Sequence, residues 1–141
     1  MTLKDLSNRF KQFQREVTEE RPQRTLEAAF DLLALVKLRI QTSGLNSDSQ
    51  PFESYTTPYS QTRQERGLQT GYVDFTDTGN LFQDIKPRIT SNDLISTTVS
   101  IRPDRQINKD KLAGFFEKRG NILLPTDDEL QTLEDLSLIH I

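Results

Sequence analysis

The segment TLEAAFDLLALVKLRIQT, residues 25–42, carries the strongest helical pattern in this chain of 141 residues. Its apolar residues recur at spacings of three and four, the period of one helix face. The stripe consists of Leu26, Ala29, Phe30, Leu33, Val36 and Ile40, widened by Leu32 and Leu35. A helix that is apolar over so much of its surface is usually the central helix of a core. Gly44 suits the left-handed position that ends a helix, so we expect a central core helix that stops there.

Upstream of this helix the sequence predicts a second, thinner amphipathic helix. Thr2 is the expected N-cap, and Asp5 places a negative charge in the first turn. The apolar face of this helix consists of Leu3, Leu6, Phe10, Phe13 and Val17. Pro22 is expected to end the helix, because proline is tolerated only in a first helical turn. We therefore expect residues 1–22 to form a helical arm that packs on something else, and residues 23–141 to form a single α+β domain.

After the central helix, turn-forming residues predict short elements. Thr57-Pro58 places a capping threonine before a proline at the first helical position. Thr78 is expected to cap a helical turn that buries Leu81, Phe82 and Ile85. In chain order the expected elements are a polar loop over 43–57, a short helix from Thr57 to Gly67, a short strand over 72–76 and the turn that begins at Thr78.

The clearest β pattern lies between residues 88 and 101. The predicted hairpin consists of a strand at 88–90, a turn at 91–93 and a returning strand at 94–101. One face of the returning strand is expected to consist of Ile95, Thr97, Val99 and Ile101. Because the opposite face is polar, the pattern indicates a half-buried antiparallel strand.

The last third of the chain predicts two helices and a short strand. Asn108 is expected to cap a helix that ends at Gly120, and residues 122–124 are expected to form a third strand. Thr126 and Glu129 have the spacing of a capping box, which predicts a final helix. The fold class is therefore α+β, with long N-terminal helices, a small antiparallel sheet made of the hairpin and a short strand, and C-terminal helices.

Composition indicates a protein that depends on partners. Only 33% of the residues are hydrophobic, and the mean hydropathy is −0.64, so the isolated core should be modest. An obligate partner or a homo-oligomer is therefore expected. The net charge of −3 lacks the basic excess of duplex-binding domains. No apolar run approaches the length of a membrane span, and the N-terminus does not resemble a signal peptide, which favours synthesis in a cytoplasm.

No constellation of residues indicates catalysis or metal binding. The chain has one histidine, His140, and no cysteine, so neither a zinc site nor a Ser–His pair is expected. The acidic run at 127–129 is explained by the first turn of the final helix, where negative charge complements the helix dipole. A carboxylate set that matches no metal-binding loop consists of Asp74, Asp77 and Asp84. We predict no catalytic, cofactor or metal site, and hence no enzyme.

Basic and aromatic residues leave a second interpretation open. Arg63 and Arg66 lie near Tyr55 and Tyr59 in the sequence, a combination that suits stacking on single-stranded nucleic acid. A short amphipathic helix with tyrosines packed beneath it explains the same residues. A small regulatory nucleic-acid-binding protein would use Arg63, Arg66, Arg88, Arg102 and Arg105. The acidic balance of the chain and the lack of a basic recognition helix count against this alternative.

Several short motifs follow one another over residues 26–138. They are VKLRI at 36–40, Gly44 with a polar loop, Pro51-Phe52, Tyr55, Pro58-Tyr59-Ser60, Arg63, Arg66-Gly67, Val73-Asp74-Phe75-Thr76, Thr78-Gly79-Asn80-Leu81, FFEKRG at 115–120 and ILLP at 122–125. Their order resembles the virion-morphogenesis and tail-completion proteins of tailed phages, the family that joins head and tail at the neck. In that family a TG turn leads into a β-hairpin.

The resemblance implies a structural virion protein that forms or completes an oligomeric ring around the DNA channel at the head–tail junction. Its implied partners are identical subunits, the connector or portal-side adaptor, and the tail tube or tail terminator protein. DNA would pass through the lumen without specific binding, no membrane is involved, and the protein would be made in the host cytoplasm and reside in the virion. The residues expected to contact subunits or partners are Leu3, Leu6, Phe10, Phe13, Phe52, Tyr55, Tyr59, Ile95 and Val99.

Overall fold

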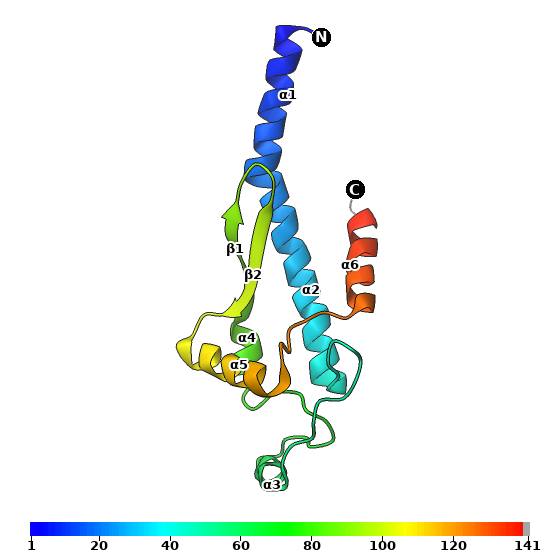
Figure 1. Cartoon of the computed structure of the whole chain (residues 1–141), viewed down its shortest axis with the longest axis vertical. Coiled ribbons are helices and arrows are strands. Elements are labelled where there is room, and N and C mark those ends of the chain that lie inside the picture. The colour runs from blue at the N-terminus through cyan, green and yellow to red at the C-terminus, as the bar shows by residue number, and fades with distance from the viewer. Residues whose placement is uncertain (140–141) are drawn as a thin grey trace.

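The structure is a computed structural model that describes residues 1–139, and it is built around one long helical rod (Figure 1). In chain order its elements are α1 (Leu3–Arg15), the π-helical segment η1 (Glu16–Glu20), α2 (Arg21–Ser43), α3 (Thr57–Glu65), α4 (Asn80–Asp84), β1 (Ile85–Asn92), β2 (Thr97–Pro103), α5 (Gln106–Arg119) and α6 (Asp127–Ile139). The hairpin and α6 lie along α2, and α1 extends beyond them. The predicted α+β class, with long N-terminal helices and C-terminal helices, is confirmed.

The expected break at Pro22 does not occur. The backbone continues from α1 to α2 through the five residues of η1, where the helix widens to π geometry. Proline has no N–H to donate, and Val17 lies five residues earlier, the span of a π-helical hydrogen bond. The Val17 carbonyl instead accepts a hydrogen bond of 3.0 Å from the Asn92 side chain in the hairpin. The Asn92 side chain thus replaces the N–H that Pro22 lacks, and the helical rod continues through the proline.

The core lies where α2 meets the hairpin, α4 and the loops. From α2 it takes three residues of the predicted stripe, Leu33, Val36 and Ile40, whereas Phe30 is half exposed. The other buried core residues are Phe52, Val73, Phe75, Leu81, Phe82, Ile85 and Ile122. Gly44 ends α2 with φ +61°, and a Cβ there would lie 2.8 Å from the Tyr72 Cβ. The predicted helix end at Gly44 is therefore confirmed and required by packing.

The hairpin is longer than predicted, and its turn lies later in the chain. β1 and β2 pair antiparallel, with Ile89 opposite Val99 and a register irregularity just after Ile89. Asp93 organises the turn, since its carboxylate accepts the N–H groups of Ile95 and Ser96, each at 2.9 Å. Ile95 therefore sits in the turn with 91% of its surface exposed, and the prediction that it shares a strand face with Val99 is wrong.

The sheet has two strands in the described part of the chain, and the strands predicted at 72–76 and 122–124 are absent. In both segments, backbone N–H groups that would pair with a neighbouring strand donate hydrogen bonds to side-chain oxygens instead. The Asp74 N–H donates to the Tyr55 hydroxyl, and the Thr76 N–H donates to the Asp74 carboxylate. In the second segment, the Leu123 N–H donates to the Asn121 side chain, which makes a turn.

The two C-terminal helices differ in how well they were predicted. Asn108 does not cap α5: it is buried within the helix and donates to the Asp84 carboxylate at 2.9 Å. Asp84 itself accepts the Arg105 N–H at the start of α5, and the Asn108 hydrogen bond is the main cause that lowers the Asp84 pKa. The capping box of α6 is confirmed, because Thr126 and Glu129 exchange hydrogen bonds of 2.9 and 3.1 Å.

Candidate functional site

The first candidate surface is α1, which we call the arm (Leu3–Arg15). None of its residues is buried. Leu3, Leu6, Phe10 and Phe13 form its apolar stripe and are between 47% and 87% exposed. Burial of such a side chain is worth about 1.5–3 kcal/mol, so covering the stripe would be strongly favourable.

The arm is a formed helix even without a partner on its stripe. Thr2 and Asp5 make a reciprocal capping box, with hydrogen bonds of 3.0 and 3.1 Å between each side chain and the other backbone N–H. The hydrogen bond from the Thr2 backbone is the main cause that lowers the Asp5 pKa. Because the helix is already ordered, docking of the arm would cost less conformational entropy than folding on contact.

The hairpin turn clamps the helical rod just after the arm, at η1 and the start of α2. The Arg21 guanidinium donates to the Thr97 hydroxyl at 3.0 Å, to the Asn92 side chain at 3.1 Å and to the Leu94 and Asp93 carbonyls. Together with the Asn92–Val17 hydrogen bond, these contacts fix the direction of the arm relative to the body. The clamp also holds the exposed Leu94 and Ile95 beside the rod.

The other predicted contact residues divide into exposed and internal ones. Phe52 is a core residue, with its ring perpendicular to that of Phe75 at 4.9 Å, so it cannot serve as a subunit contact. Tyr55 and Val99 are half-buried, and Tyr59 is exposed. Of the predicted set, the arm residues, Tyr59 and Ile95 are therefore the exposed ones.

Arg63 and Asp74 form a buried ion pair beneath α3. The Arg63 side chain is 2% exposed and donates to Asp74 at 3.2 Å, to the Gln69 carbonyl at 3.0 Å and to the Thr76 carbonyl at 2.8 Å. The Tyr55 ring lies 4.5 Å from the guanidinium carbon. The Arg63 guanidinium thus holds together three residues of the loop after α3, Gln69, Asp74 and Thr76.

Tyr55 is a sensitive probe of this network. Its hydroxyl donates to Asp74 at 3.0 Å, and burial, the largest cause, raises its pKa above the ordinary value of 10.0. A raised phenol pKa means that folding favours the neutral form, so this contribution to stability is present below pH 10 and is lost as the pH rises through the folded pKa. In an absorbance titration of the three tyrosines, we expect one phenol to ionise later than a free tyrosine.

The Tyr55→Phe variant assigns that late step. It should lose the late-titrating phenol, whereas the matched Tyr59→Phe variant should keep it. A late step that survives in Tyr55→Phe would show that the network does not hold this hydroxyl in its neutral form.

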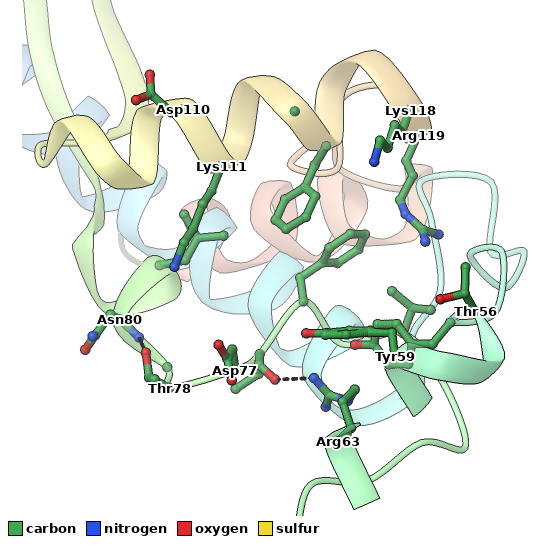
Figure 2. A pocket seen from close by; sticks show the side chains of 18 residues that line it. Thr56, Tyr59, Arg63, Asp77, Thr78, Asn80, Asp110, Lys111, Lys118 and Arg119 are labelled. Carbon is green, nitrogen blue, oxygen red and sulfur yellow. Dashed lines mark hydrogen bonds between the residues drawn. The ribbon is translucent and has the colours of Figure 1, made fainter. Parts of the chain in front are cut away.

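A cavity of about 410 Å³ lies between α3 with the residues just before it, the segment 73–81 that leads into α4, and α5. Figure 2 shows Tyr59 lying over Arg63, with Arg119 reaching toward them from α5. Lys111 and Lys118 add further cations to the α5 side of the cavity. Phe75, whose backbone has a positive φ of 54°, contributes its aromatic ring to the lining. The wall offers aromatic and cationic contacts but contains no imidazole or thiol that could act as base or nucleophile.

The described residues contain no group of three histidine, cysteine or acidic side chains that could hold a metal. The carboxylates considered in the sequence have separate roles: Asp74 pairs with Arg63, Asp77 with Arg66, and Asp84 bonds to Asn108. His140 lies outside the described residues.

Three of the five arginines of the nucleic-acid interpretation are engaged within the protein, whereas Arg102 and Arg105 are exposed. Arg63 is buried, and Arg66 and Arg88 form ion pairs with Asp77 and Asp104. A phosphate backbone is usually bound by clustered exposed cations. Arg63 in particular cannot stack on a base, because its guanidinium is already enclosed by protein.

Two important arginines were missed by the sequence analysis. Arg21 clamps the hairpin turn, and Arg39 joins α2 to α6 through Glu129 while donating to the Leu45 and Leu124 carbonyls. Pro22 inside a helical pattern was a signal for a special joint at Arg21. Arg39 had no local signal, because its partners lie up to 90 residues away.

No protein-family model, curated protein or solved structure matches this chain.

Proposed function

We propose that this chain is a structural virion protein of a tailed phage that forms or completes a ring at the head–tail junction. The observation that carries the proposal is the arm, which projects from the body with a solvent-exposed apolar stripe (Figure 1). Large apolar surfaces of this kind mark interaction sites. The arm is capped at its start and clamped at its base, so it presents the stripe as a fixed surface.

Two further features support assembly as the role of this fold. The two-stranded sheet offers strand edges, which are natural templates for pairing with another chain. The Thr78-Gly79 turn leads through α4 into the hairpin, as the resemblance to tail-completion proteins implies. Among residues 1–139, the helices are too short or too polar to cross a membrane.

Electron microscopy of a phage that carries a nonsense mutation in the gene for this chain tests the proposal. We expect DNA-filled heads beside complete, unattached tails, because the joining step would lack a subunit. Supplying the chain from a plasmid should restore joined particles. Normal infectious particles from the mutant would refute the role in head–tail joining.

A further inference from the structure

The arm and α6 are complementary in charge. The arm contains the basic residues Lys4, Arg9, Lys11 and Arg15 and one acidic residue, Asp5, so its net charge is +3. Helix α6 contains the acidic residues Asp127, Asp128, Glu129, Glu134 and Asp135 and no basic residue, so its net charge is −5. Only one of these five acids, Glu129, is neutralised by a described ion pair, with Arg39. Charge complementarity of this size favours association of the two helices.

The two helices also match in length and spacing. Each has 13 residues, about 20 Å at 1.5 Å per residue. Lys4 and Lys11 are seven residues apart on the arm, and the acidic pairs at 127–128 and 134–135 are likewise seven apart on α6. A repeat of seven brings side chains back to nearly the same helix face, so both sets of charges can meet along one line.

Apolar surface accompanies the acids on α6 and on the face of α2 beside it. Leu130 is 46% exposed, and Leu136 is half-buried. Arg39 reaches α6 from α2, and Leu35 and Leu32 lie four and seven residues before it, on the same helix face. Both leucines are half-buried. We call this combined surface, formed by α6 and the Arg39 side of α2, the α2–α6 face.

A chain cannot place its own arm on its own α2–α6 face. The arm continues the direction of α2 through η1, whereas α6 stands beside α2 (Figure 1). The Arg21 clamp and the Asn92–Val17 hydrogen bond hold the arm away from the body. The complementary surfaces can therefore meet only between two copies.

We infer that the arm of one copy docks on the α2–α6 face of a second copy, with the apolar stripe against leucines and the lysines against the acids of α6. This contact rests on the proposed ring of identical subunits and names the surfaces that close it. It is heterologous, because a different surface of each copy is used, and heterologous contacts generate rings when the rotation closes.

Charge reversal on each side tests the contact. Lys4→Glu/Lys11→Glu in the arm and Glu134→Lys/Asp135→Lys in α6 change exposed side chains only. Lys4→Glu places an acid in the first turn of α1, and the α6 changes place cations toward the end of that helix, so both helices should persist. We expect each double variant to weaken self-association about tenfold or more, and the quadruple variant to regain most of that loss. Sedimentation velocity over a concentration series measures the association, and circular dichroism checks the fold.

The matched control for the arm variant is Lys109→Glu/Lys118→Glu, which makes the same change in net charge on exposed residues of α5. It should leave association within about threefold of the original chain, since charges away from a contact act weakly through salt. Equal weakening by the control, or no recovery in the quadruple variant, would overturn the inference.

Cross-linking identifies which copy receives the arm. The chain has no cysteine, so Lys11→Cys/Glu134→Cys introduces one thiol on each surface. A bismaleimide should link these thiols between chains and give a ladder of multimers on a denaturing gel. An internally linked monomer, or no link at all, would overturn the inference. Oligomers that form without this link would overturn the proposed contact but leave the ring proposal standing. The ring proposal is tested separately, by electron microscopy of particles from the nonsense mutant.

Discussion

Replacing Arg63 with alanine is expected to lower the free energy of unfolding by about 3–5 kcal/mol, the cost of leaving a buried charge without its partner. Asp74 would keep its buried position, since it also bonds to Tyr55, Gln69 and Thr76. The Gln69 and Thr76 carbonyls would lose the donors that now satisfy them. Small domains are stable by only about 5–15 kcal/mol, so this variant should lose a large fraction of its stability.

The matched control for Arg63 lies three residues along the chain. Arg66 pairs with Asp77, but the two side chains are 45% and 43% exposed, so Arg66→Ala should cost at most about 1 kcal/mol. Urea denaturation followed by circular dichroism compares the two variants. Arg63→Lys should lie between them, because it keeps the charge but cannot donate in three directions. Equal midpoints for Arg63→Ala and Arg66→Ala would contradict the role given to the buried pair.

The parts of the fold that were predicted from sequence are those governed by neighbouring residues. The predicted N-cap Thr2 and the predicted capping box of Thr126 with Glu129 are both present, and Thr2 also forms a full capping box with Asp5. Gly44 ends α2 because the left-handed position is local to the helix. Local rules succeed here because the competing conformations are decided within one helical turn.

Several of the errors arise where a distant side chain replaces the local partner. Pro22 should have ended a helix, but Asn92 supplies the missing donor from the hairpin. Asparagine is a preferred N-cap residue, which favoured Asn108 as the cap of α5. The Asp84 carboxylate instead accepts the Arg105 N–H at the start of that helix. The segment at 72–76 has strand propensity, but the Asp74 N–H is held by the Tyr55 hydroxyl, 19 residues away in the sequence. Sequence patterns do not report such long-range hydrogen bonds.

The candidate surfaces also differ in whether local sequence patterns predict them. The stripe of the arm follows from helical spacing alone, and it is exposed because no element among residues 1–139 covers it. The α2–α6 face joins helices whose contact residues, Arg39 and Glu129, are 90 positions apart, and no periodic pattern predicts that they meet. The cavity beside Tyr59 is likewise assembled from three separate segments.

The second large effect is expected from Arg39, which fixes α6 to the end of α2. Its side chain and that of Glu129 are 9% and 11% exposed, so Arg39→Ala should destabilise the chain by about 3 kcal/mol or more. The loss has a specific structural consequence. Arg39 also donates to the Leu124 carbonyl just before α6, so both the entry and the first turn of that helix would come loose.

A double-mutant cycle with Glu129→Gln separates the ion pair from the capping box. Glutamine keeps an oxygen for the Thr126 N–H, so the cap persists while the charge is removed. We expect Arg39→Ala/Glu129→Gln to be more stable than the sum of the single losses, by about 0.5–3 kcal/mol, because the buried carboxylate no longer lacks a cation. Arg24→Ala is the matched control on the same helix, since the Arg24–Glu16 pair is largely exposed. Additive losses in the cycle would mean that α6 is held by its apolar contacts, and the α2–α6 face would then depend on leucines rather than on this arginine.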